Sequence, residues 1–311
     1  MKKQELLPAR KRAKIRAALA KREAVLRAQV RAVVQGYTSA LFVWGPGGLG
    51  KSHILASELE GLVGTGWQHH TSYTTPKALL LSLAEFPDSI HVFEDCEKMY
   101  KTDVSSSILR AACAAPKGKA RWVIYETATE NLRVNFKGGI IIVSNENIAK
   151  GSGPLAAVAS RFRPVKWDLS SEERMARMLD IADQGWSRGP YSLATKDCLE
   201  VAYFLIEEMR GGGARVPVDL RTFTEHALPA FAQCSKQKGG VDWRDMVRAK
   251  LQGEVGQVEK RSEKTSRLQL LASTIAADDK TSGKEKLEKW TQQTGLGKSI
   301  YYRHLREAPR G

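Results

Sequence analysis

Residues 45–52 read Gly45-Pro46-Gly47-Gly48-Leu49-Gly50-Lys51-Ser52 and fit the phosphate-binding pattern G-x-x-x-x-G-K-[ST] without a mismatch. Glycines have no Cβ atom, so this loop can take positive φ angles and turn its backbone N–H groups toward the phosphates of a ligand. Lys51 supplies a point charge to those phosphates, and Ser52 begins a helix and offers its hydroxyl to Mg²⁺. With His53 as its last member, this stretch predicts a nucleotide triphosphate site for ATP and Mg²⁺.

The flanking residues support the prediction. Residues 40–44 form an apolar run typical of a buried strand, and residues 52–59 have the pattern of a helix. A second apolar strand, 89–93, ends in Glu94 and Asp95, which we expect to hold the metal and to orient an attacking water. A third, 140–144, ends in Asn145, which is either a plain turn residue or a group that binds the water or the γ-phosphate. Strands separated by helices indicate a parallel α/β sheet.

Composition narrows the class of protein. The chain has 311 residues, of which 42% are hydrophobic, which is enough for one large α/β unit with appendages. Its four cysteines form no C-x-x-C pair, so neither a zinc ribbon nor a disulfide framework is indicated. Apolar runs of membrane-spanning length and a secretory leader pattern are both missing from the sequence. We therefore expect a protein that is not secreted and has no membrane partner. Its expected location is the cytoplasm, or a nucleoid or viral replication site.

Basic charge is concentrated at the two ends. Of the net charge of +15, residues 1–35 carry 11 Lys and Arg against 2 acids, and residues 244–311 carry 15 against 9, whereas residues 36–243 carry 23 of each. This distribution favours a polyanionic partner that contacts the ends, and nucleic acid in particular. Residues 9–34 predict one long basic helix with a narrow apolar stripe, which either packs on the core of the chain or acts as a nucleic-acid-binding or subunit-bridging arm.

Five regions are predicted along the chain. They are a basic helix or arm (1–35), a phosphate-loop core (36–168), a helical lid (169–251), a linker (252–282) and a small helical unit (283–311). Residues 170–173 have the pattern of a helix cap, and the third lid helix, near 219–235, places Arg221 where it can face the nucleotide.

The last 29 residues predict two helices joined by a short glycine-containing turn. This is the pattern of a helix-turn-helix, although an ordinary helical hairpin fits it too. The basic balance favours DNA binding. The expected DNA contacts from the turn and the second helix are Lys298, Ser299, Tyr301, Tyr302 and Arg303.

Taken together, residues 36–250 resemble an AAA+ ATPase. The resemblance rests on the order of the phosphate loop, the strand ending in Glu94-Asp95, Asn145 as sensor 1, Ser160-Arg161-Phe162 as an arginine-finger segment, and Arg221 as sensor 2. It implies a homo-oligomeric ring or filament, with a hexamer expected, in which Arg161, together with Arg163, reaches the neighbour's ATP. An arginine that begins a strand here also lies at the rim of the nucleotide site. One departure is the order Glu-Asp where the family has Asp-Glu, which implies slow turnover or exchanged roles.

The predicted strands at 121–125 and 132–136 are similar to the hairpin that helicase-type members of the family direct toward the ring pore. The similarity makes Arg121, Arg133 and Lys137 candidate DNA contacts. We therefore expect a DNA-acting ATPase of replication, such as a helicase, an initiator or a helicase loader, with a helicase, polymerase or transposase as protein partner. The Gly-Lys-Ser-His run also resembles loader and transposition ATPases of the DnaC and IstB kind. The alternatives are a transposition ATPase that forms DNA filaments, a nucleotide-switched transcription regulator and, last, a protein unfoldase.

Overall fold

The computed structural model describes residues 7–64, 66–71, 75–96, 99, 102–147, 158–210, 219–236, 241–277 and 281–307, apart from the side chains of residues 236, 253–264 and 267. The chain divides into two compact units. One comprises Met1–Ile206 with Asp219–Ala232, and the other Glu207–Val218 with Gln233–Gly311.

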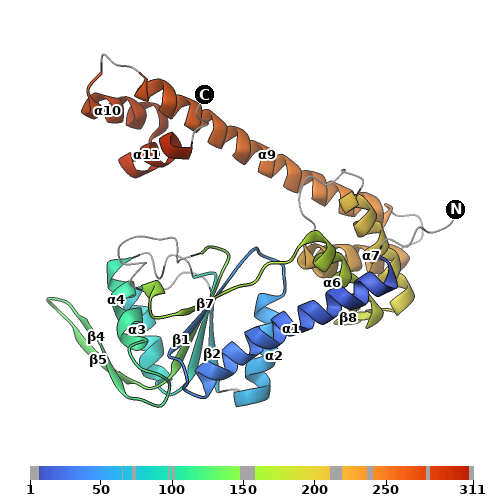
Figure 1. Cartoon of the computed structure of the whole chain (residues 1–311), viewed down its shortest axis with the longest axis horizontal. Coiled ribbons are helices and arrows are strands. Elements are labelled where there is room, and N and C mark those ends of the chain that lie inside the picture. The colour runs from blue at the N-terminus through green and yellow to red at the C-terminus, as the bar shows by residue number, and fades with distance from the viewer. Residues whose placement is uncertain are drawn as a thin grey trace. The chain divides into compact units, whose positions relative to one another are not determined.

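A sheet of five parallel strands forms the centre of the first unit, in the order β2-β3-β6-β1-β7 (Figure 1). The strands are β1 (Ala40–Trp44), β2 (Trp67–Thr71), β3 (Ile90–Glu94), β6 (Gly139–Ser144) and β7 (Arg163–Lys166). The inner strands β1, β3 and β6 are buried along nearly their whole length because both faces of the sheet are covered. Because the strands are parallel, the phosphate loop after β1 meets the segments that follow β3 and β6 at one edge of the sheet.

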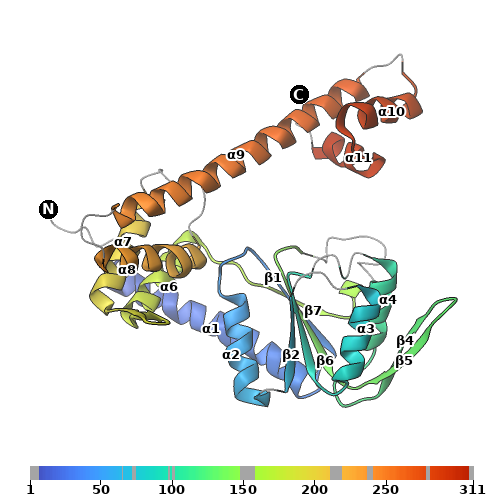
Figure 2. The ribbon, with the colours of Figure 1, turned by 180° about the vertical axis from the view of Figure 1, so that it is seen from behind.

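Helices cover both faces of the sheet. The helices α1 (Ala9–Val34) and α2 (Lys51–Val63) lie on one face, and α3 (Pro76–Glu85) and α4 (Asp103–Ala112) on the other (Figure 1 and Figure 2). An antiparallel hairpin of β4 (Arg121–Glu126) and β5 (Asn131–Phe136) packs against α3 and α4. One apolar cluster joins Phe42 and Phe93 of the sheet to Phe136 of the hairpin and to leucines of α3 and α4. This core fixes the edge at which the candidate site lies.

A helical lid follows the sheet, as predicted. It consists of α6 (Ser171–Asp183), a short hairpin of β8 (Trp186–Arg188) and β9 (Tyr191–Leu193), α7 (Thr195–Arg210), the π-helical segment η3 (Thr222–Ala227) and α8 (Leu228–Lys236). The predicted cap of α6 is present, because Ser170 and Glu173 each accept a hydrogen bond from the other's backbone N–H. The N-terminal helix α1 packs along α2 and α6 and is docked on its own chain.

The second unit contains α9 (Trp243–Ala276), α10 (Gly283–Thr294) and α11 (Lys298–Glu307). The predicted pair of helices joined by a short turn is present, and Gly295 ends α10 with a φ of 69°. The predicted linker at 252–282 is wrong, because α9 continues unbroken to Ala276. The polar and charged composition indicated a linker, with only a short helix near 268–276, yet Glu, Lys and Gln are good helix formers, and each of the two glycines costs a helix only about 1 kcal/mol. Among the described helices, none is both long and apolar enough to cross a membrane.

Candidate nucleotide site

Lys51 is the central cation of the phosphate loop. Its ammonium group donates to the carbonyl oxygens of Gly45 at 2.7 Å and Pro46 at 2.8 Å, and to Oδ1 of Asn145 at 3.2 Å. The residue is only 6% exposed, so its charge is held inside the site. An ammonium group that donates to these oxygen acceptors can exchange them for the oxygens of a bound phosphate and keep its number of hydrogen bonds.

Glycines allow the loop to pack closely under its neighbours. A Cβ atom on Gly45 would lie 1.8 Å from the carbonyl oxygen of Trp167. One on Gly48, where φ is 68°, would lie 2.1 Å from Oδ2 of Asp219. Gly50 has open space beside it, but its φ of 81° lies in the left-handed region that favours glycine. The backbone of the loop therefore contacts both the sheet edge and the first residues of the third lid helix.

The two acids after β3 have different partners. Ser52 donates its hydroxyl hydrogen to Oε1 of Glu94, and Oε2 of Glu94 lies 3.1 Å from Nε2 of His69 on β2. Asp95 has a φ of 54°, which is uncommon outside glycine, and its Oδ1 accepts a hydrogen bond from Nδ2 of Asn145 at 3.2 Å. Glu94 is thus placed beside the serine hydroxyl, and Asp95 beside the amide that also contacts Lys51.

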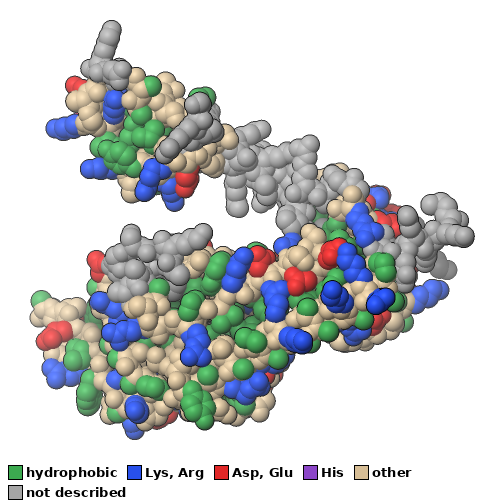
Figure 3. Space-filling view, viewed as in Figure 1, with side chains coloured by type: hydrophobic (Ala, Val, Ile, Leu, Met, Phe, Trp, Pro, Cys, Tyr) green, Lys and Arg blue, Asp and Glu red, His purple; other side chains and the backbone are tan. Residues whose placement is uncertain are grey.

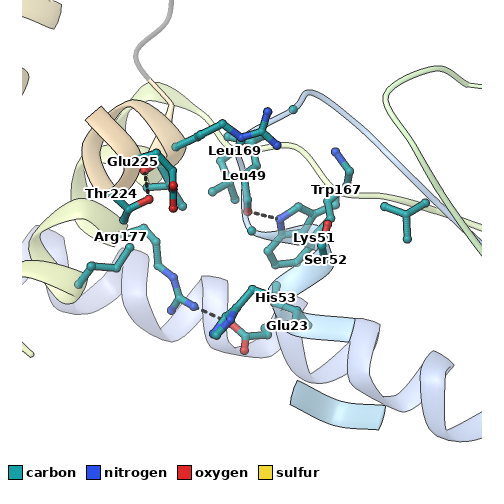
Figure 4. Close-up of a pocket in the computed structure, with 18 of the residues that line it drawn as sticks. Glu23, Leu49, Lys51, Ser52, His53, Trp167, Leu169, Arg177, Thr224 and Glu225 are labelled. Atoms are coloured by element: carbon teal, nitrogen blue, oxygen red, sulfur yellow. Dashed lines mark hydrogen bonds and ion pairs between the residues drawn. The ribbon is translucent and has the colours of Figure 1, made fainter. Parts of the chain in front are cut away.

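These groups line a pocket of about 840 Å³, which is large enough for a nucleotide (Figure 4). The loop, both acids and Asn145 line the pocket, together with residues of α1, α6 and η3. Arg221 and His53 also line the pocket. The backbone N–H of Leu220 donates to the carbonyl of Gly48 at 3.0 Å, which ties the lid to the loop.

Arg161 and Arg163 are not among the residues that line this pocket. Arg163 is the first residue of β7 and pairs with Leu41 near the start of β1, whereas the loop follows the far end of β1. About 10 Å of strand separates the two ends. Arg163 donates to Oε1 of Gln29 on α1 at 2.8 Å. The expectation that an arginine here lies at the rim of its own site is wrong, because parallel pairing places the start of β7 at the opposite edge of the sheet.

The three DNA contacts predicted on and beside the β4–β5 hairpin differ in their exposure. Arg133 and Lys137 are exposed. Arg121 is only 7% exposed, and its guanidinium group donates to four backbone carbonyls while lying over the ring of Phe136. Burial lowers the pKa of Arg121, but a guanidinium group stays charged in proteins. The prediction of Arg121 as a DNA contact is therefore wrong, because its donors are used inside the fold.

A similar correction applies to α11. Tyr301 is 3% exposed and packs against Trp290, with ring centroids 5.4 Å apart, so it belongs to the core of the second unit and is not a surface contact. The other predicted contacts, Lys298, Ser299, Tyr302 and Arg303, are all exposed, and so is Arg306, which was not predicted as a contact. The exposed side of α11 thus carries three basic residues and one tyrosine.

Several residues at or beside the pocket were not predicted. His69 contacts the pocket residue Glu94 from outside the lining. Trp167 donates its indole N–H to the carbonyl of Leu49 at 2.9 Å, and Glu23 of α1 pairs with Arg177 of α6 at 3.5 Å. No local motif marks these residues, since they reach the site from elements distant in sequence. The apolar stripe of α1 was the only signal, and it indicated docking without naming a surface.

The residues at the loop fit a nucleotide bound with Mg²⁺. Ser52 and Glu94 offer adjacent oxygen ligands, and nucleotide-bound Mg²⁺ typically takes one or two protein side chains and completes its shell with phosphates and water. The buried ammonium of Lys51 offsets the negative charge that phosphates bring. The parallel strand order, the phosphate loop after β1 and the helical lid form a P-loop α/β fold.

A scan against protein-family models finds no matching family, and a search of curated proteins finds no match. Among solved structures, the chain is similar to NtrX from Brucella abortus in complex with ATP, with 13% identity over 93% of this chain and 68% of that one and a TM-score of 0.45. It is also similar to the RuvB Holliday junction branch migration motor of Thermotoga maritima, with 14% identity over 95% and 87% of the two chains and a TM-score of 0.40.

Proposed function

We propose that the chain is an oligomeric AAA+ ATPase that uses ATP and Mg²⁺ to act on DNA in replication, as a helicase, an initiator or a helicase loader. The observation that carries the proposal is the meeting of Lys51, Ser52, Glu94 and Asn145 in one pocket behind a complete phosphate loop. Side chains from three strand ends converge there, which a chance glycine-rich turn does not explain.

Each residue of the site has a chemical task in this proposal. Lys51 binds the β- and γ-phosphates, and Ser52 and Glu94 hold Mg²⁺. When bound, Mg²⁺ neutralises part of the charge that develops on the phosphates. Asp95 accepts a proton from the attacking water, and Asn145, which donates to Asp95 at 3.2 Å, orients both. Arg221 of the lid, which lines the same pocket, contacts the phosphates as well.

The position of Arg161 and Arg163 supports the oligomer in this proposal. Neither residue lines the pocket of its own subunit, and Arg163 begins β7 at the edge of the sheet opposite the loop. An arginine that stabilises the γ-phosphate in the transition state must then come from the adjacent subunit, as in a ring or filament. Hydrolysis would therefore require assembly.

The DNA part of the proposal rests on the second unit and the hairpin. Lys298, Arg303 and Tyr302 share the exposed side of α11, where cations can contact phosphates and the tyrosine a base edge. Arg133 and Lys137 are exposed on and beside β5. A helicase, polymerase or transposase remains the proposed protein partner, and the cytoplasm or nucleoid the proposed location.

The test is the rate of ATP hydrolysis at several protein concentrations, with no DNA, single-stranded DNA or duplex DNA. The proposal expects a rate that rises more than linearly with protein concentration and increases with DNA. Arg161→Ala should not hydrolyse ATP by itself, and mixing it with the unmodified chain should lower the rate of hydrolysis per unmodified subunit. A rate that is proportional to protein concentration and indifferent to DNA would contradict it.

One observation favours two alternatives, a nucleotide-switched DNA-binding regulator and a filament-forming transposition ATPase. The acid placed to activate water is the short Asp95, with the longer Glu94 turned to Ser52 and His69, an arrangement suited to slow turnover. Sequence-specific DNA binding that survives removal of ATP would favour the regulator. Stable ATP-bound filaments that do not separate a forked duplex would favour the transposition type.

A further inference from the structure

Several arginines of α1 pair with acids of this chain. Arg12 pairs with Asp180 of α6 at 2.6 Å, and Arg27 and Arg31 pair with Glu58 of α2 at 3.0 and 2.5 Å. Figure 3 shows Lys and Arg side chains lying among Asp and Glu on the face that carries α1. The helix therefore joins the core to the lid, and these three arginines are engaged within the chain.

Arg22 lies at the centre of this connection. Its Nη1 donates to Oε1 of Glu173 at 2.6 Å, its Nη2 donates to the carbonyl of Asp168, and its Cζ lies 5.5 Å from the centroid of the Trp167 ring. Burial alone would raise the pKa of Glu173, but hydrogen bonds from Ser170 and Arg22 lower it on balance, so this acid is charged at neutral pH. One guanidinium group thus contacts the end of the sheet and the first turn of α6.

Trp167 carries this contact to the phosphate loop. Its indole N–H donates to the carbonyl of Leu49, and its backbone N–H donates to the carbonyl of Trp44, the residue before the loop. Its own carbonyl oxygen occupies the space that a Cβ on Gly45 would need. Because Trp167 is only 4% exposed and lines the pocket, its position determines where the loop and the pocket wall lie.

The part of α1 around Arg22 also reaches the pocket directly. Leu19 and Glu23 line it, and Glu23 pairs with Arg177, which projects from the second turn of α6 (Figure 4). Arg22 and Glu23 therefore hold α6 at two successive turns, one outside the pocket and one on its wall. Moving α6 would move a wall of the nucleotide site.

We infer that Arg22 is a positioning residue of the nucleotide site, which holds Trp167 against the phosphate loop and α6 beside it, and so sets how tightly nucleotide is bound. The inference rests on the proposed nucleotide function. Arg22 touches neither the loop nor the acids that face the phosphates, so its loss should weaken binding and leave the chemical step nearly intact.

The experiment compares Arg22→Ala, Arg22→Lys and Lys21→Ala in the full chain, with steady-state hydrolysis of ATP as the readout. Lys21 is the matched control, because it is exposed, carries the same charge and makes no ion pair within the described part of the chain. We expect Arg22→Ala to raise KM for ATP about tenfold with kcat within about twofold, and Arg22→Lys to recover part of the loss because it keeps the charge without the planar fork. Lys21→Ala should match the unmodified chain.

The outcomes separate this inference from the proposed function. Partial unfolding of Arg22→Ala would lower kcat in proportion to the inactive fraction and leave KM unchanged, and that result, or a KM equal to that of Lys21→Ala, would overturn the inference. If Arg22→Ala does not fold, an unchanged KM in Arg22→Lys overturns it equally. If Lys51→Ala hydrolyses ATP as well as the unmodified chain, the proposed function itself fails.

Discussion

Replacing Arg121 by Met should destabilise the fold and leave the salt dependence of DNA binding unchanged. Methionine retains most of the side-chain volume and removes every donor. The guanidinium group bonds the carbonyls of Ala112 and Gly138, each at 2.5 Å and both buried, and those of Pro116 and Lys119 at 3.0 and 2.9 Å nearer the surface. Leaving a buried carbonyl without a donor costs about 1–3 kcal/mol, so the two buried ones give a loss of about 4 kcal/mol.

The assay is urea unfolding followed by tryptophan fluorescence, together with DNA binding at several salt concentrations. Arg133→Met is the matched control, since Arg133 is exposed on the adjacent strand and bonds only to the neighbouring Asn131 among the described residues. It should leave stability within about 0.5 kcal/mol and reduce the salt slope by about 0.7–0.9 for one phosphate contact. A stable Arg121→Met with a reduced salt slope would refute the assignment of Arg121 to the interior.

Three further predictions concern other parts of the chain. Burial lowers the pKa of His91 to about 4, so between about pH 6.5 and 4 the unfolded chain binds a proton that the folded chain excludes. The free energy of unfolding should therefore fall by about 3 kcal/mol as the pH is lowered across that window. His91→Gln should flatten this fall when unfolding is measured as a function of pH. Gly45→Ala should abolish ATP binding because its Cβ would meet backbone, whereas Gly50→Ala, with open space beside it, should bind ATP with a loss of about 1–2 kcal/mol by calorimetry. Tyr302→Ala should weaken DNA binding without lowering the melting temperature, while Tyr301→Ala should lower the melting temperature. The reverse pattern would show that the DNA-binding side of α11 has been assigned wrongly.

The site elements that the sequence predicted are local ones. The phosphate loop is defined by spacing alone, and Glu94 and Asn145 are marked by their place directly after buried apolar strands. Since parallel strands end at one edge, their meeting at the loop follows from topology. The cap at Ser170 is a local pattern as well, and the structure contains it.

What the sequence could not predict depends on tertiary contacts. Arg121 and Arg133 look alike in the sequence, and only strand pairing and packing on α4 decide that one is buried and the other exposed. In the same way, the sequence of α11 does not decide whether Tyr301 or Tyr302 faces solvent, because that depends on which of them packs against Trp290. The basic charge of α1 indicated a polyanion because its partners on α2 and α6 lie far away in the chain.

The most direct test of the nucleotide site is calorimetric titration of ATP with Mg²⁺ into the unmodified chain and into Lys51→Ala. Lys51 makes three contacts with the loop and with Asn145, and no other described lysine lines the pocket. Saturable binding by the unmodified chain that is lost or weakened at least about a hundredfold in Lys51→Ala is the expected result. Equal binding by both proteins, or binding by neither, would contradict the assignment of this pocket to ATP.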